Sequence, residues 1–172
     1  MYTRIKKRQG FSLSELMVAI TIFTVVSTGA TLSFSMGIRA YRQAMAETDA
    51  SVNASTTLSR IASGIGDSCG LRAAFIPVTT FRDNNGWLIT FTVPKGLSGS
   101  DVQVNKLHYD KSAKTVSIQA GNVNTWHIIG KNIVDSTISA SELSVHISVT
   151  AKAVVGYDHV TSTKSSTISF RN

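Results

Sequence analysis

Residues 6–23, KKRQGFSLSELMVAITIF, decide the fold of this chain. A basic leader ends at Gly10, Phe11 begins an apolar segment, and Glu15 places one carboxylate near the start of that segment. The apolar run continues from Leu16 to Ile38, which is 23 residues without a charged side chain. A helix rises about 1.5 Å per residue, so this run is long enough to cross the roughly 30 Å hydrocarbon core of a bilayer. The stretch therefore predicts a membrane-spanning helix.

The charges on either side of this run predict its orientation. Four basic side chains precede it, and Arg39 is the first charge behind it; the four are Arg4, Lys6, Lys7 and Arg8. Positive charge is retained in the cytoplasm, which predicts a single-pass membrane protein with a cytoplasmic amino terminus and the bulk of the chain outside. A cleaved secretory signal peptide is the alternative, with 44–46 as a small-x-small site. We disfavour it because the apolar run is longer than such signals carry.

Glu15 is the informative residue of the segment. A carboxylate inside a membrane helix costs roughly 2–3 kcal/mol on insertion scales unless it is paired. One alternative is that Glu15 lies shallow enough to reach the lipid headgroups. Cleavage after Gly10 would instead create a new amino terminus at Phe11, one helical turn away, whose positive charge offsets the carboxylate within the chain or on a neighbour.

Residues 7–20 resemble the type III signal sequence of type IV pilins and type II secretion pseudopilins. The shared pattern is a glycine at the end of the leader, a phenylalanine after it, a leucine two residues later, a glutamate at the fifth mature position, and an apolar helix. The resemblance implies that a prepilin peptidase cuts after Gly10 and methylates the amine of Phe11. It also implies that Glu15 attracts the Phe11 amine of the adjacent subunit during filament assembly. The implied partners are the peptidase, other pilins or pseudopilins in a helical filament, the inner-membrane assembly platform, and membrane lipid before assembly.

Apolar residues recur beyond the membrane at mostly three- and four-residue steps, which predicts that the helix continues to about residue 65. The recurring residues are Ile38, Tyr41, Met45, Thr48, Val52, Leu58, Ile61 and Ile65. Glycines at 64, 66 and 70 end the pattern. We therefore divide the chain into a leader (1–10), a transmembrane and assembly half of the helix (11–38), a second half packed on the globular domain (39–66), and a β domain (67–172).

The β domain shows alternating apolar and polar residues, which indicates antiparallel strands. The expected strands are 75–81, 87–93, 104–109, 114–119, 126–129, 133–138, 143–150 and 166–170, with a loop at 156–164. In the strand after residue 142, Leu143, Val145, Ile147 and Val149 are expected to face the core. The second half of the helix is expected to cover the apolar face of the sheet. The predicted fold class is α+β: a long N-terminal helix packed on a C-terminal antiparallel β-sheet, which is also what the resemblance implies.

A weaker similarity in the C-terminal half favours a minor subunit. Four segments are similar to J-type pseudopilins and to W-type minor pilins: Leu107–Asp110, Trp126–Val134, the alternating strand at 143–150, and Thr167–Asn172. The chain also lacks the C-terminal cysteine pair of many major pilins, since Cys69 is its only cysteine. An intrachain disulfide is thereby excluded, and a bridge to a second chain through Cys69 stays open.

The composition and the spacing of polar residues give little support for catalysis or nucleic-acid binding. The formal net charge of +7 falls to +3 without the leader, because 13 basic then face 10 acidic side chains. The four histidines are far apart in sequence, with no acidic or cysteine partner at ligand spacing: His108, His127, His146 and His159. We therefore predict no enzyme activity, no catalytic residue, no metal and no cofactor. A basic face made by Lys111, Lys114, Lys131, Lys152 and Lys164 with His127 is the minority reading, and a nucleic-acid partner is disfavoured.

Three functions follow from the sequence. The favoured one is a structural subunit, a minor pilin or pseudopilin of a type IV pilus or type II secretion pseudopilus. The second is a pilus-tip minor pilin that binds DNA or a surface through its C-terminal domain. The third is a permanently anchored single-pass protein unrelated to filaments. The sequence leaves open whether the apparatus secretes proteins, drives twitching or takes up DNA.

Overall fold

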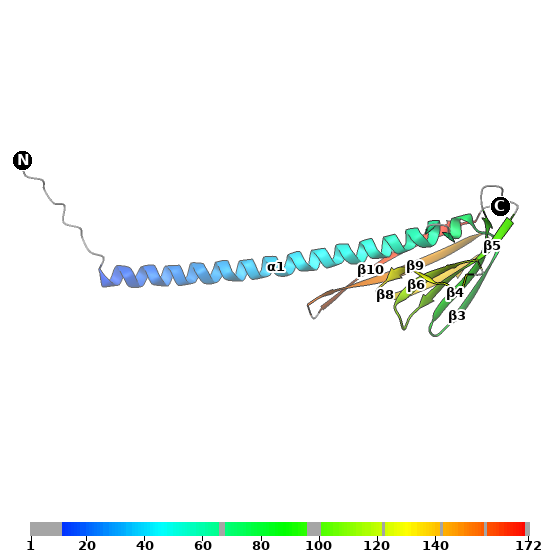
Figure 1. The fold of residues 1–172 in the computed structure, drawn as a ribbon. Helices are drawn as coiled ribbons and strands as arrows, with labels where there is room; N and C mark the ends of the chain where they lie inside the picture. Colours follow the sequence, from blue (N-terminus) through cyan, green and yellow to red (C-terminus); the bar gives the residue numbers. More distant parts are fainter. Residues whose placement is uncertain are drawn as a thin grey trace, which may run out of the picture. The chain divides into compact units, whose positions relative to one another are not determined.

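The computed structural model of the protein describes residues 12–65, 68–95, 101–121, 123–141, 143–156 and 158–170. Its helices are α1 (Leu13–Ser63) and the short 3-10 helix η1 (Leu71–Ala73). The described strands are β1 (Gly64–Ile65), β2 (Ser68–Cys69), β3 (Phe75–Asp83), β4 (Gly86–Lys95), β5 (Asp101–Asp110), β6 (Thr115–Ala120), β7 (His127–Lys131), β8 (Ile133–Ala140), β9 (Ser144–Val155) and β10 (Asp158–Ser169) (Figure 1). The chain divides into two compact units between Arg42 and Gln43.

The strands of the second unit form two main antiparallel sheets, where the sequence indicated one. The five-stranded sheet has the order β3-β4-β5-β6-β7, and the three-stranded sheet has the order β10-β9-β8. Two backbone hydrogen bonds lie where the two sheets meet. The N–H of Ile133, at the start of β8, donates to the carbonyl of Lys114, just before β6, at 3.0 Å. The N–H of Lys152 in β9 donates to the carbonyl of Asn132, between β7 and β8, at 2.9 Å. A long N-terminal helix packed on antiparallel sheets is confirmed, and it is the arrangement of a type IV pilin-like α+β protein.

The helix ends two residues earlier than the pattern indicated. Its last residue is Ser63, and Gly64 follows with a φ of +86°. Glycine adopts this left-handed conformation without steric cost, and helices commonly end at such a residue. The chain then turns back through β1 and β2, which pair with each other. The predicted role of Gly66 falls outside the described residues.

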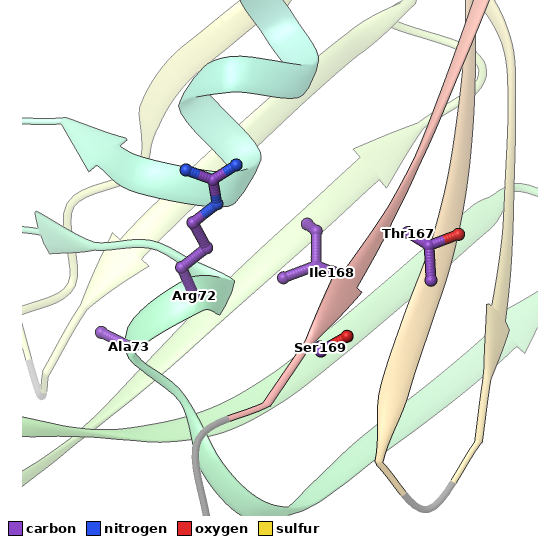
Figure 2. A pocket seen from close by; sticks show the side chains of 5 residues that line it. All are labelled: Arg72, Ala73, Thr167, Ile168 and Ser169. Atoms are coloured by element: carbon purple, nitrogen blue, oxygen red, sulfur yellow. The ribbon is translucent and has the colours of Figure 1, made fainter.

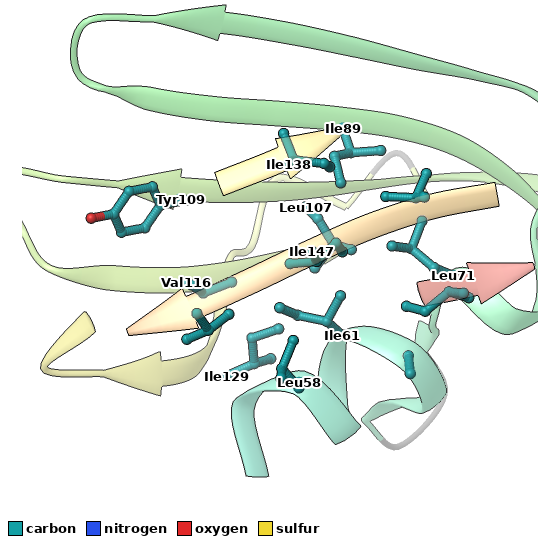
Figure 3. Packing of buried hydrophobic residues seen from close by; sticks show 14 of the residues in the cluster. Leu58, Ile61, Leu71, Ile89, Leu107, Tyr109, Val116, Ile129, Ile138 and Ile147 are labelled. Atoms are coloured by element: carbon teal, nitrogen blue, oxygen red, sulfur yellow. The ribbon is translucent and has the colours of Figure 1, made fainter. Parts of the chain in front are cut away.

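The core lies between the two sheets and the last turns of α1. Trp87, Ile89, Phe91 and Val93 alternate along β4 and are all buried, as their pattern predicts. Figure 3 shows the helix side chains Leu58 and Ile61 meeting side chains from both sheets. The buried cluster thus joins the C-terminal part of the helix and the sheets into one folding unit.

The expected apolar face of β9 is only partly correct. Val145, Ile147 and Val149 are fully buried, whereas Leu143 is 58% exposed and precedes the first residue of β9. Leu143 belongs to the connection from β8, where its carbonyl accepts a hydrogen bond from Phe170 at 2.9 Å. The alternating pattern therefore extended one residue too far toward the N-terminus.

The apolar stripe predicted for the helix is wrong for its first part. Met45 and Val52 are 50% and 56% exposed, and the buried residues are the alanines Ala46, Ala50 and Ala54. An alanine face lets a helix backbone approach its neighbours closely, so the larger side chains are turned to the opposite side. Within the predicted stripe, the buried residues are those of the last two turns, Leu58 and Ile61.

The predicted loop at 156–164 is also wrong, because β10 begins at Asp158. β9 and β10 pair along their whole length, from Asp158 opposite Val155 to Ser169 opposite Ser144. The signal was weak because β8 pairs with β9 only as far as Ala151, so the end of this hairpin has no core face to bury. Backbone pairing and strand-forming Val and Thr residues hold it without an apolar alternation.

Candidate functional site

The start of α1 is closed by reciprocal hydrogen bonds between Ser12 and Glu15. The backbone N–H of Ser12 donates to Oε2 of Glu15 at 3.0 Å, and the backbone N–H of Glu15 donates to Oγ of Ser12 at 3.3 Å. This is a capping box, in which each side chain satisfies a backbone donor that the helix leaves free. The Ser-x-x-Glu spacing of residues 12–15 is the sequence signature from which it could have been predicted.

The capping box explains how an acidic side chain is accommodated at this position. The carboxylate of Glu15 lies in the first turn, where the helix dipole favours negative charge. It also accepts a backbone hydrogen bond, so its isolation in an apolar segment is reduced before any second chain is present. Gly10 and Phe11 lie outside the described residues. Cleavage after Gly10, methylation of Phe11 and its pairing with Glu15 therefore stay predictions.

The first unit contains the apolar part of α1. An 18-residue window of this helix has a mean hydropathy of 1.8, which is apolar enough for a membrane span, and none of that window is buried within the structure. Its threonine hydroxyls donate to the carbonyl four residues earlier, at 2.7–2.9 Å; these are Thr21, Thr24, Thr28 and Thr31. Because the helix itself satisfies these hydroxyls, the segment can enter an apolar phase without outside partners for them.

The second half of α1 is fixed to the edge strand β7 by polar contacts. Nδ2 of Asn53 donates to the carbonyl of Lys131 at 2.6 Å, and Nη1 of Arg60 donates to that of Ile129 at 3.0 Å. Between these contacts, a Cβ on Gly130 would lie 2.5 Å from Oγ1 of Thr57. The helix thus covers backbone groups that an edge strand otherwise leaves free, and only glycine permits the approach.

The strands bring together part of the basic face considered in the sequence. Lys131 pairs opposite Thr115, next to Lys114, whose carbonyl accepts a hydrogen bond from Ile133. The backbone of Lys152 bonds to that of Asn132. These contacts gather Lys114, Lys131 and Lys152 around the β7–β8 connection. Lys164 lies elsewhere, opposite Val149, and His127 lies opposite Ile118.

The histidines are dispersed, and His108 and His146 make separate contacts. The ring of His108 lies 5.7 Å from that of Trp126, and Nδ1 of His146 is 3.0 Å from Oγ1 of Thr167. Among the residues that the structure describes, no group of three histidine, cysteine or acidic side chains is placed to hold a metal ion.

An open pocket of about 500 Å³ lies between η1 and the end of β10 (Figure 2). It is lined by Arg72, Ala73, Thr167, Ile168 and Ser169.

The comparison with protein families points to the N-terminal segment. Residues 5–31 match the family model described as the prokaryotic N-terminal methylation motif. Neither the curated proteins nor the solved structures gave a match. The matched residues include the capping box and run into the apolar part of α1. The motif, the helix of membrane-spanning length and the helix-on-sheet domain together support a type IV pilin-like protein, the precursor of a pilin or pseudopilin that a prepilin peptidase processes.

Proposed function

We propose that the chain is a minor pilin or pseudopilin, a structural subunit of a type IV pilus or type II secretion pseudopilus. The observation that carries this proposal is the N-terminal methylation motif at residues 5–31, whose later residues form the start of α1. A motif that directs cleavage and methylation at a helix start suits a protein whose helix is transferred from the bilayer into a filament. The subunit then acts by assembly, with no catalytic residue and no cofactor.

In this proposal, prepilin peptidase cuts after Gly10 and methylates the new amine of Phe11. Before assembly, the subunit is a single-pass inner-membrane protein held by lipid, with its second unit outside the cytoplasm. In the filament, the carboxylate of Glu15 pairs with the Phe11 amine of the adjacent subunit. The capping box supports this order of events, because Glu15 has an internal partner until a stronger, charged one arrives.

The exposed side of the second half of α1 supports a packing surface beyond the membrane. Met45 and Val52 are both at least half exposed, while the alanines on the other side of the helix pack on the domain. A large apolar side chain turned away from its own domain is suited to contact with another helix. We propose that other pilins or pseudopilins, positioned by the inner-membrane assembly platform, cover these side chains in the filament.

Two substitutions at Glu15 separate its capping role from its charge. Glu15→Gln keeps an oxygen that can accept the Ser12 N–H but removes the negative charge, whereas Glu15→Ala removes both. We expect both variants to insert into the membrane normally and to lose most incorporation into filaments, measured by quantitative immunoblotting of sheared filaments against membranes. The matched control is Glu47→Gln, an exposed acid on the same helix. Normal incorporation of Glu15→Gln would contradict the charge pairing.

The basic cluster around the β7–β8 connection favours a second candidate function, a pilus-tip subunit that binds DNA or a charged surface. Lys114 and Lys131 are exposed, and the backbone contacts described above bring Lys152 near them. Binding through phosphate contacts weakens as salt rises. The test is a gel-shift titration of the full chain at two salt concentrations, with all three lysines changed to glutamine and Lys95→Gln as a control. An absence of salt-sensitive binding would exclude this candidate.

A further inference from the structure

The edge strands of the second unit differ in how they are protected against pairing with a further strand. β3 contains Pro77, which lacks a backbone N–H, and its pairing with β4 shifts register between Phe75 and Thr79. β7 is covered by α1 through the hydrogen bonds described above. β10 has none of these protections: it is 12 residues long, contains no proline, and pairs with β9 without a register shift. Its outer side is therefore open to strand addition.

The backbone of β10 presents every second N–H and C=O to this outer side, because hydrogen-bonded and non-hydrogen-bonded pairs alternate along an antiparallel ladder. Phe170 donates to the carbonyl of Leu143, just before β9, at 2.9 Å. Lys152 of β9 lies opposite Thr161 and donates away from β10, to Asn132. Both bonds indicate the same alternation, in which the even-numbered residues of β10 bond toward β9. The outward-facing backbone groups therefore belong to His159, Thr161, Thr163, Ser165, Thr167 and Ser169.

Solvent reaches the middle of this edge. Thr163, Lys164 and Ser165 are consecutive and all exposed, so neither face of the strand is covered there. Among the strands that the structure describes, β9 alone pairs with β10. A long, regular edge with exposed backbone groups is the surface to which an extended segment of another protein adds as a further strand.

A hollow lies at the C-terminal end of the same edge. It is the open pocket of about 500 Å³ between η1 and β10, and Figure 2 shows Ile168 extending from β10 toward η1, where Arg72 lines the other side. Among its described lining residues, Arg72 is charged and none is acidic. The end of an added strand would enter this hollow and meet a guanidinium, which is suited to binding a carboxylate.

A second positive charge lies four residues before Ile168 on β10. Side chains four residues apart along a strand point to the same face, so the exposed Lys164 shares the face of Ile168. An antiparallel partner strand would place two of its own side chains, also four residues apart, opposite these two positions. Carboxylates there would each lie beside a positive charge, and cross-strand pairs of opposite charge stabilise a sheet.

We propose that β10 binds an extended segment of a partner protein by strand addition, and that this segment carries two acidic residues four positions apart. The first carboxylate enters the hollow beside Arg72, and the second lies opposite Lys164. Backbone pairing supplies the affinity, and the two charges fix the register. A second copy of this chain does not offer such a segment, because no two of its 10 acidic residues are four positions apart. The binding does not depend on leader processing, so it can fail while the proposed function holds.

The test uses the full chain in detergent and three synthetic nine-residue peptides with blocked ends. The acidic peptide has glutamate at its first and fifth positions, and threonine and valine at the others. The basic peptide has lysine in place of both glutamates. The third peptide is the acidic one with proline at its fourth and sixth positions, which removes two backbone donors that would face β10. Fluorescence anisotropy of the labelled peptides measures binding, and amide hydrogen exchange of the chain reports which residues of β10 become protected.

Two variants with matched controls separate backbone pairing from charge. Ser165→Pro removes one outward N–H and leaves the bonds to β9, because an edge strand tolerates proline where its N–H faces solvent. Ser165→Ala is its control. Arg72→Glu reverses the charge of the hollow, and Lys95→Glu, at the end of β4, is its control. The fluorescence of buried Trp87 checks that each variant is folded.

We expect saturable binding of the acidic peptide, with slower exchange of the Thr161, Thr163 and Ser165 amides in the complex. Ser165→Pro and Arg72→Glu should each raise its dissociation constant about fivefold or more, as expected for loss of one hydrogen bond or charge pair, and both controls should bind as the unchanged chain does. The basic and the proline-containing peptides should bind at least about tenfold more weakly.

The proposal is overturned if the acidic peptide does not bind, or if Ser165→Pro binds it as well as Ser165→Ala does. Equal binding of the acidic and basic peptides would overturn it too, because the charges would then select nothing. Self-association of the unchanged chain that Ser165→Pro abolishes would also overturn it, because a second copy would then occupy the edge.

Discussion

Gly130→Ala should loosen the contact between α1 and β7. The new Cβ would lie 2.5 Å from Oγ1 and 2.6 Å from Cγ2 of Thr57, well inside the usual contact distance. Thr57 cannot easily turn away, because it is fully buried and its hydroxyl donates to the carbonyl of Asn53 at 2.8 Å. The helix must therefore shift, which lengthens the bonds from Asn53 and Arg60 to β7. We expect a loss of about 1–3 kcal/mol in the free energy of unfolding, as for other overpacked sites.

A double-mutant cycle locates the cause. Thr57→Ala alone should cost about 1 kcal/mol, the value of a buried methyl-sized group. In the double variant, the nearest remaining atom is Cβ of residue 57 at 3.1 Å, so most of the Gly130→Ala penalty should disappear. Urea unfolding of the full chain in detergent, followed by the fluorescence of buried Trp87, measures all three variants. Gly37→Ala is the matched control, because nothing lies within 4 Å of its new Cβ. Additive penalties at 57 and 130 would refute the steric argument.

Two further predictions concern buried polar groups. Asn105→Ala should lower the free energy of unfolding by at least about 2 kcal/mol. The buried Asn105 amide donates to the Cys69 carbonyl at 2.9 Å and accepts from the Gly121 N–H at 3.1 Å, and both backbone groups would lose this partner. Gln103→Ala removes only a side-chain donor to Asn105, so it should cost less in the same urea titration. Tyr109→Phe should keep or raise stability at neutral pH, because the buried hydroxyl has no hydrogen-bond partner within the described part of the chain. Burial first, and then the charges of Asp135 and Asp110, raise the pKa of Tyr109 above its ordinary value of 10.0. The unfolded chain therefore loses the phenol proton at a lower pH than the folded chain does. The unchanged chain should lose stability as the pH rises above about 10 and through the raised pKa, and Tyr109→Phe should lose less. Equal alkaline losses in both chains, measured by thermal unfolding across this pH range, would count against the burial of the phenol.

Two sequence patterns made much of the fold predictable. The charge-free run near the amino terminus predicts a long helix, and strict alternation at 87–93 predicts a strand with one buried face. Both elements are confirmed, and the helix is long and apolar enough for a membrane span. The helix stripe was harder, because a large apolar residue such as Val52 signals burial more strongly than alanine does. The domain packs through Ala46, Ala50 and Ala54 instead, since the helix comes close to the rest of the domain there. The periodicity of the helix sequence does not show how closely the helix approaches the sheets.

The contacts that shape the sites depend on residues far apart in sequence. The Thr57–Gly130 approach and the bond from Trp87 to Ser136 each join segments whose proximity only the tertiary fold creates. The capping box is different, because Ser12 and Glu15 are three residues apart and their pattern was readable in the sequence. The unpartnered hydroxyl of Tyr109 had no sequence signal, since a tyrosine in an alternating strand usually reaches solvent or a partner.

In the proposed function, this chain is a precursor whose leader is removed at one peptide bond. Intact-mass measurement of the protein purified from membranes of a cell that contains a prepilin peptidase, combined with sequencing of its amino terminus, tests this claim most directly. We predict a mature chain that begins at N-methylated Phe11. Its mass should be that of residues 11–172 plus the CH2 that methylation adds. A protein that still begins at Met1 in those membranes would contradict the proposal.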